Sequence, residues 1–318
     1  MWDCRYSLLY PASGVHGNDH AARDWCSSLV TITESTPGLR GSIRRRPLIW
    51  FFGLANLLSW AVWTPYILSE NGLGLLHFSY PELLGNTQLS GVLPGAYLGP
   101  IFSAYVVTLV ADGRPGLRRW VGRLANWRVS WRWYVGVVLA VPVTLTLSSM
   151  ALYDQNPMLP TVGALVAYVP GLVLQMVTTG LAEEPGWRDF ALPRLQQRFG
   201  PLGGTLILGP LWGVWHLPLF FSEWGNWPHW TWTTPVEFVA TCVTFSITMT
   251  WVFNRSGESL PIAMLLHTSV NNFFSIVWSD MFPQLSIQDT SHAFLLGSAT
   301  VALVVLLLTR GRLGYKPA

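Results

Sequence analysis

Long apolar runs alternate with short polar connections from residue 47 to the C-terminus. Each run is about 20 residues long, the length that an α-helix needs to cross the hydrocarbon core of a bilayer. The pattern predicts an all-α fold, a multi-pass integral membrane helical bundle of about eight transmembrane helices. The predicted helices cover residues 48–68, 90–111, 131–152, 161–183, 203–222, 235–254, 260–279 and 293–309.

The first 46 residues break this pattern, because they are polar, mixed in charge and without periodicity. They also lack the basic start, apolar middle and small-residue cleavage site of a signal peptide. We therefore predict a disordered cytoplasmic tail over residues 1–46 and a single transmembrane domain over residues 47–318.

The composition agrees with a membrane protein. Charged residues make up 11% of the chain and hydrophobic residues 51%. Soluble domains carry about 25% charged residues, which argues against an ordinary soluble enzyme, and the apolar content excludes intrinsic disorder. The net charge of +3 does not indicate a nucleic-acid partner, because the basic residues beyond the tail sit in short clusters between the apolar runs.

The basic residues also alternate from one connection to the next. Cytoplasmic loops of membrane proteins are enriched in Lys and Arg, so the alternation predicts a multi-pass cell-membrane protein with both termini in the cytoplasm. The connections that contain Lys or Arg are 112–132, 184–202, 255–259 and 310–318, and those that contain neither are 69–89, 153–160, 223–234 and 280–292.

The second predicted helix carries a row of glycines. Gly91, Gly95 and Gly99 recur at four-residue intervals. Small residues at this spacing allow another helix to approach closely. We expect this face to pack within the chain rather than to form a dimer interface.

Few ionisable side chains fall at membrane depth, where each is costly to place. Counted from residue 260, His267 lies about 10 Å deep, and Asn271 is one turn further along the same helix face. Since Glu183 ends its predicted helix on the cytoplasmic side, we expect one shared cavity that opens to the cytoplasm. The candidate site residues are Glu183, Glu184, Arg188, His216, His267 and Asn271.

These groups suit hydrolysis of a peptide bond. A carboxylate beside an imidazole holds a water molecule and removes its proton. A second imidazole and an amide donate hydrogen bonds to the oxyanion that forms when water attacks a carbonyl. Neither a GxSxG nor an HExxH motif is present, which argues against the common serine-hydrolase and zinc-protease arrangements. Two His with one or two Glu would still make an adequate zinc shell.

Each candidate also has a purely structural explanation. Glu184 and Arg188 are spaced as an i,i+4 helix ion pair, and Pro185-Gly186 would bend the helix after the two acids. Asn271 would suit a hydrogen bond to a neighbouring helix. The joint occurrence of these groups, with almost no other ionisable residue at membrane depth, favours a functional site.

Three short motifs resemble those of the CPBP family, which comprises CAAX prenyl endopeptidases and bacteriocin-processing or immunity proteins of the Abi type. The family motifs are EExxxR, an aromatic residue followed four positions later by His, and HxxxN. One departure is Asp189, at a position where many members have Gly. The similar segments here are Glu183–Arg188, Trp212–His216 and His267–Asn271.

The resemblance implies a membrane-embedded, glutamate-type peptidase without a resident cofactor, zinc being the open alternative. It assigns Glu183 as the general base and His216 as a residue that helps to hold the water. It assigns His267 and Asn271 to the oxyanion site, and Glu184 and Arg188 as supporting residues.

We therefore expect an intramembrane endopeptidase that hydrolyses a peptide bond near the cytoplasmic membrane face. Its expected partners are the lipid bilayer and a membrane-associated peptide or protein substrate, which need not be prenylated, and no nucleic acid. Two alternatives stay open: a non-catalytic membrane protein that confers immunity or regulates by binding, and a zinc-dependent peptidase that uses the same residues.

Overall fold

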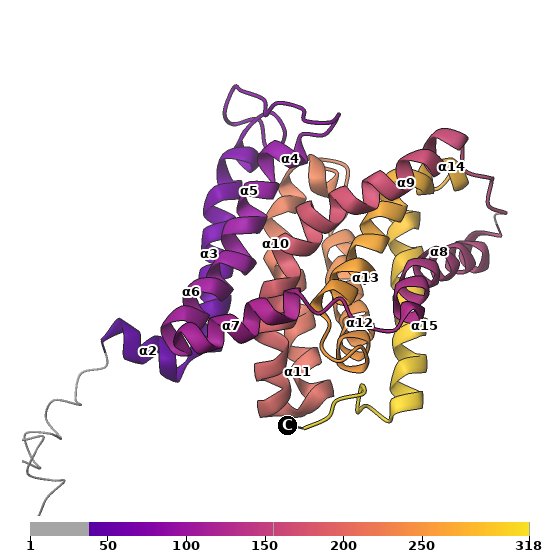
Figure 1. The fold of residues 1–318 in the computed structure, drawn as a ribbon. Helices are drawn as coiled ribbons and strands as arrows, with labels where there is room; N and C mark the ends of the chain where they lie inside the picture. The colour runs from indigo at the N-terminus through magenta and orange to yellow at the C-terminus, as the bar shows by residue number, and fades with distance from the viewer. Residues whose placement is uncertain (1–37, 155, 318) are drawn as a thin grey trace, which may run out of the picture.

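The computed structural model describes residues 38–154 and 156–317, and most of them lie in helices (Figure 1). Within these ranges the only β-type pairing is an isolated bridge between Leu83 and Asn86. Seven helices in the described part of the chain are long and apolar enough to cross a membrane. The predicted all-α, multi-pass membrane bundle is therefore confirmed.

The first part of the chain forms one long helix and a broken helix beside it. α3 (Pro47–Leu68) starts with a proline, which suits the first turn of a helix. Of the predicted disordered tail, residues 1–37 lie outside the described residues, and the prediction is wrong for its end, which forms α2 (Leu39–Arg45). The second predicted helix consists of α4 (Gln88–Gly91), α5 (Leu93–Ala96), the π-helix η1 (Tyr97–Ile101) and α6 (Phe102–Ala111).

The glycine row of this broken helix is covered by α3. The Ser59 hydroxyl of α3 donates a hydrogen bond to the Gly95 carbonyl at 2.8 Å. Added β-carbons would overlap α3 side chains, so the close approach requires glycine and the predicted packing within the chain is confirmed. The distances would be 2.1 Å from Gly91 to Tyr66, 2.3 Å from Gly95 to Trp63 and 1.9 Å from Gly99 to Ser59.

Two helices follow α6 along the chain. α7 (Gly113–Leu124) is short and rich in Arg, and lies across the lower part of the bundle in the view of Figure 1. α8 (Trp131–Tyr153) is a candidate membrane span and matches the third predicted helix.

The centre of the fold is one helical run of 60 residues, Val162–Phe221. It contains two predicted helices, 161–183 and 203–222, which is why seven candidate spans are found instead of eight. The run turns at Gly200, whose φ of 75° lies in the left-handed region that glycine adopts without strain. Its parts are α9 (Val162–Gln175), the π-helices η2 (Met176–Gly180) and η3 (Pro185–Ala191), α10 (Leu181–Glu184), α11 (Leu192–His216) and the 3₁₀-helix η4 (Leu217–Phe221).

The expected cytoplasmic connection at 184–202 is helical instead. Pro185 and Gly186 suggest a helix end, but the chain passes through them in the wider π-helix η3, a form often found at functional sites. The helix then continues to Phe199, about 20 Å beyond Glu183. Glu183 therefore lies inside the bundle rather than at the end of a span.

The remaining helices enclose the site. The span Leu260–Met281, which begins with α13, is the most enclosed of the candidate spans, since 72% of its apolar window is buried. α13 packs against α8, α9 and α12. The elements are η5 (Glu223–Gly225), α12 (Thr233–Arg255), α13 (Leu260–Phe273), η6 (Phe274–Trp278), α14 (Ser279–Met281) and α15 (Ile287–Thr309).

Candidate active site

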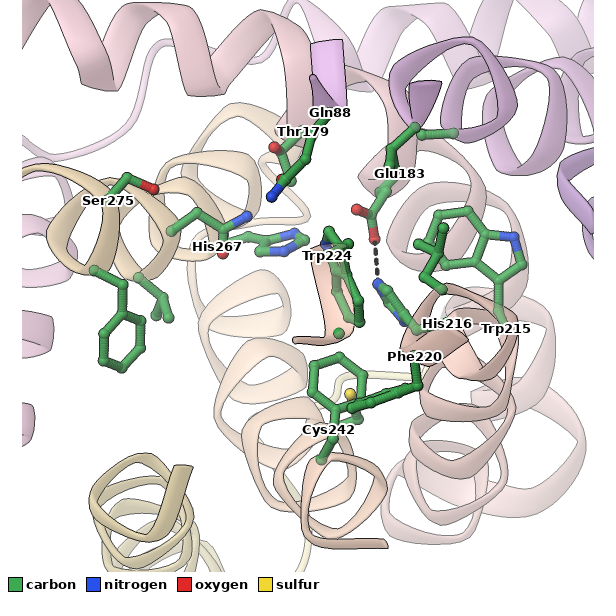
Figure 2. A pocket seen from close by; sticks show the side chains of 18 of the residues that line it. Gln88, Thr179, Glu183, Trp215, His216, Phe220, Trp224, Cys242, His267 and Ser275 are labelled. Carbon is green, nitrogen blue, oxygen red and sulfur yellow. Dashed lines mark ion pairs between the residues drawn. The ribbon is translucent and has the colours of Figure 1, made fainter. Parts of the chain in front are cut away.

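A cavity of about 510 Å³ lies among α10, α11, α12 and α13 (Figure 2). Four of the six residues predicted for the site line its wall: Glu183, His216, His267 and Asn271. The other two, Glu184 and Arg188, are fully buried behind that wall. The structure thus brings together residues from three segments that are far apart in the sequence.

Glu183 is held in place by close backbone packing and by one strong hydrogen bond. A β-carbon at Gly186 would lie 2.6 Å from Pro100, so glycine is needed for η3 to pack against η1. The Glu183 side chain is nearly buried, and Trp212 donates its Nε1–H to Oε2 at 2.8 Å. The second carboxylate oxygen, Oε1, has no hydrogen-bond partner among the described residues.

His216 faces Glu183 across the cavity. Its Nδ1 lies 2.9 Å from the Trp212 carbonyl oxygen, which only accepts hydrogen bonds, so Nδ1 carries the proton and Nε2 is the acceptor of the neutral ring. Nε2 lies 4.0 Å from Glu183 Oε2 (Figure 2). The ring also stacks on Trp224, with centroids 5.5 Å apart and planes at 18°. The carbonyl and the indole together fix the orientation of the imidazole.

His267 is oriented by the second acid of the pair. Glu184 Oε1 lies 2.7 Å from His267 Nδ1, and Glu184 Oε2 lies 3.5 Å from Arg188 Nε in the predicted i,i+4 pair. The Arg188 guanidinium lies over the Trp212 ring at 4.5 Å. Because Glu184 engages Nδ1, the other ring nitrogen of His267, Nε2, is left to act in the cavity.

The two asparagines of α13 have different partners. Asn271 lies one turn after His267, lines the cavity and is half-buried. Its amide makes no side-chain hydrogen bond within the described part of the chain, so it is free to bind a ligand. Asn272 instead donates to the Tyr168 carbonyl at 3.0 Å and ties α13 to α9.

Three residues that complete the cavity were not among those predicted: Gln88, Glu223 and Trp224. They come from the connections 69–89 and 223–234. The Glu223 carboxylate joins these connections, accepting hydrogen bonds from Asn71 at 2.8 Å and Thr87 at 2.6 Å. Their only sequence signal is one acid among several Trp residues, and no periodicity relates the two segments.

The cavity opens on the side that carries the Arg-poor connections. Asn86, Glu223 and Ile287 are exposed residues of its lining. No described residue of 112–130, 192–202, 255–259 or 310–317 contributes to the lining. The expectation that the cavity opens toward the Arg-rich connections is therefore wrong. The reason is the continuation of the helix to Phe199, which separates Glu183 from the Arg-rich end of the bundle.

A metal ion in the cavity would need several donor atoms to converge on one point. In the described part of the chain, no group of three or more His, Cys, Asp or Glu is arranged to hold a metal ion. Glu184 Oε1 and His267 Nδ1 face each other at 2.7 Å. A zinc ion bound through these atoms would require the pair to separate.

Comparison with known proteins matches the part of the chain that builds the cavity. Residues 165–273 match the family described as "Type II CAAX prenyl endopeptidase Rce1-like", and this segment contains all six predicted site residues. A "CAAX prenyl protease 2" of Methanococcus maripaludis is 28% identical over 110 residues, which are 33% of this chain and 39% of that protein. The match thus spans about two fifths of the relative's length.

Proposed function

Since residues 165–273 match the Rce1-like CAAX prenyl endopeptidase family, we propose that the chain is a CPBP-type intramembrane endopeptidase in which Glu183 activates water for hydrolysis of a peptide bond. One observation carries the proposal: Glu183 Oε2 and His216 Nε2 lie 4.0 Å apart in the wall of the cavity. His267 and Asn271 line the same cavity on one face of α13.

The spacing of Glu183 and His216 suits one shared water molecule. A distance of 4.0 Å is too long for a direct hydrogen bond and short enough for one water to contact both atoms. Both atoms accept hydrogen bonds, so they bind the two hydrogens of that water. Its oxygen lone pairs are then directed at the carbonyl carbon of a peptide bond in the cavity.

The reaction proceeds by addition and elimination. Glu183 takes a proton from the water as the oxygen bonds to the carbonyl carbon, and the carbonyl oxygen becomes an oxyanion. The Asn271 amide and the Nε2–H of a protonated His267 donate hydrogen bonds to it. Collapse of the intermediate breaks the C–N bond, and the proton on Glu183 passes to the leaving amine nitrogen. The products are a new carboxylate and a new amino terminus.

Glu184 and Arg188 act in this proposal as positioning residues. The Glu184 carboxylate contacts His267 Nδ1 at 2.7 Å, and its negative charge balances the positive charge of a protonated His267. Arg188 holds Glu184 from the opposite side at 3.5 Å. Neither side chain lines the cavity.

The proposal is tested by enriching protein termini from membranes of the native host. Strains with the wild-type protein, Glu183→Gln and Glu237→Gln are compared at equal expression. Glu237→Gln is the matched control, because this carboxylate contacts His292 at 3.2 Å and does not line the cavity. We expect a set of new N-termini in the wild type and in Glu237→Gln that is absent from Glu183→Gln.

Identical termini in all three strains would contradict the peptidase function. Immunity or regulation that persists in a Glu183→Gln, His267→Ala double variant would then show that the cavity is not catalytic in that role. Zinc dependence is tested separately, by the metal content of the purified protein and by its activity in the presence of a chelator. We expect no stoichiometric zinc and no loss of activity; stoichiometric zinc with chelator-sensitive cleavage would assign the same residues to a metallopeptidase.

A further inference from the structure

The side of the bundle opposite the cavity mouth is closed by α7. Trp120 donates its indole N–H to the Pro185 carbonyl at 3.0 Å, directly behind Glu184. Arg123 bridges the buried Asp189 at 2.6 Å and Glu258 at 2.8 Å. Burial acts to lower the pKa of Arg123, but the two carboxylates outweigh it and raise the pKa above its ordinary value.

Further hydrogen bonds seal this side below the cavity. Asn126 donates to the Gly257 carbonyl at 3.1 Å, and Ser259 donates to the Asn126 carbonyl at 2.7 Å. Between α11 and α12, Gln196 and Asn254 exchange hydrogen bonds at 3.2 and 2.7 Å. None of the described residues of these connections lines the cavity that contains Glu183.

The opposite side carries the mouth of the cavity. Gln88 of α4 directs its side chain into the cavity (Figure 2), and its amide has no hydrogen-bond partner among the described residues. The exposed Asn86 and Glu223 lie at the rim. The connections that form this rim, 69–87 and 222–232, contain no Lys or Arg.

The two sides differ in charge as the two faces of a cell membrane do. Every Arg or Lys between residues 47 and 318 except the buried Arg188 lies at the closed side, in or beside α7, in α11 near its turn, at 255 or at the C-terminal end. Lys and Arg concentrate in the cytoplasmic loops of membrane proteins. The closed side is therefore the cytoplasmic side, and the mouth faces away from the cytoplasm.

The lining indicates which peptides fit. Aromatic rings such as Trp212, Trp224 and Phe238 supply much of its apolar surface. Its carboxylates are Glu183 and Glu223, and none of the described lining residues is Lys or Arg. Such a cavity favours a neutral or basic apolar segment and disfavours an acidic one, because like charges repel at close range.

From these observations we infer that the substrate enters from the extracytoplasmic side, as an apolar, neutral or basic segment of an exported or membrane-anchored protein at the outer membrane surface. This inference rests on the proposed peptidase function, because it takes the segment that enters the cavity to be a substrate. The side on which the cavity opens is independent of that function.

The inference is tested by labelling single cysteines with a membrane-impermeant maleimide. The full chain carries Cys4→Ser, Cys26→Ser and Cys242→Ala, with one new cysteine at a time. Gln88→Cys reports the cavity, His77→Cys the Arg-poor connection and Arg119→Cys the exposed face of α7. Intact spheroplasts are compared with inverted membrane vesicles.

We expect His77→Cys and Gln88→Cys to be labelled in spheroplasts, and Arg119→Cys to be labelled only in inverted vesicles. Any result in which Gln88→Cys is not labelled from outside overturns the inference, and so does labelling of Gln88→Cys and Arg119→Cys from the same side. The labelling needs no enzymatic activity, so it decides the side of access even if the peptidase function fails.

The terminal-enrichment experiment separates the two proposals. Glu183-dependent cleavage sites in extracytoplasmic segments support both. Glu183-dependent sites in cytoplasmic segments overturn the side of access and leave the peptidase function standing.

Discussion

Glu184 Oε1 and His267 Nδ1 are in direct contact at 2.7 Å, with the Glu184 side chain fully buried and that of His267 7% exposed. The preceding residue, Glu183, instead lines the cavity. Two consecutive acids thus have different environments, because η3 turns the chain immediately after them. The Glu183 carboxylate faces the cavity, and the Glu184 carboxylate contacts an imidazole.

This difference predicts that the same substitution destabilises the protein at one of the two acids and not at the other. Glu184→Gln leaves the charge of Arg188 buried without its partner, which costs about 3–5 kcal/mol when a buried ion pair is broken on one side. Glu183→Gln retains an oxygen that accepts the Trp212 hydrogen bond. We expect the unfolding midpoint in detergent to fall for Glu184→Gln and to stay near wild type for Glu183→Gln. Equal midpoints would contradict these assignments.

Trp212 is predicted to orient the carboxylate of Glu183, the proposed general base. Trp212→Phe removes the donor to Glu183 and keeps an aromatic ring beside Arg188. Loss of a hydrogen bond to a charged group costs about 1.5–3 kcal/mol, so we expect kcat/KM to fall by roughly ten- to a hundredfold. The matched control is Trp232→Phe, since Trp232 is 74% exposed. An unchanged kcat/KM in Trp212→Phe would remove Trp212 from the mechanism.

The glycine row predicts another matched pair of variants. Gly99→Ala places a methyl group 1.9 Å from Ser59 Oγ, whereas a β-carbon at Gly53 meets nothing within 4 Å. Alanine is favoured over glycine in a helix interior by about 1 kcal/mol. We expect Gly99→Ala to lower the unfolding midpoint in detergent and Gly53→Ala to raise it slightly. Tolerance of Gly99→Ala would show that α3 and η1 do not pack this closely.

Arg123 is predicted to anchor α7 to the bundle. Arg123→Met retains an apolar stem but leaves the Asp189 carboxylate, which is fully buried, without its cation. Breaking such a pair costs about 3 kcal/mol or more. We expect faster limited proteolysis within 112–130 and a lower unfolding midpoint for Arg123→Met. Arg119→Met is the control, since Arg119 is exposed and makes no ion pair in the described structure; equal behaviour of the two variants would contradict the anchor.

The membrane-spanning pattern and the grouping of the site follow from the sequence, because both depend on local signals. About 20 apolar residues in a row specify a spanning helix, and the candidate site residues include almost all of the ionisable groups at that depth. Their packing around a single cavity agrees with this expectation. The roles of the individual residues stay predictions until variants are measured.

The direction in which the cavity opens did not follow from the sequence. Pro185 and Gly186 signal the end of a helix, and only the tertiary packing of Gly186 on Pro100 shows how the chain continues through them as η3. The residues of the rim did not follow from the sequence either, because tertiary packing brings Glu223 to Asn71 and Thr87, which are far from it in the sequence. Asp189 is similar: its buried pairing with Arg123 gives the departure from the family's usual Gly a structural explanation.

The most direct test of the central claim is the cleavage rate of the purified, reconstituted protein on a substrate found by terminal enrichment. Wild type, Glu183→Gln and the control Glu237→Gln are compared at equal amounts of folded protein. Removal of a general base is expected to lower kcat by about 10²–10⁴-fold, so we predict that drop for Glu183→Gln, with Glu237→Gln within about twofold of wild type. A Glu183→Gln protein that cleaves at the wild-type rate would contradict the account.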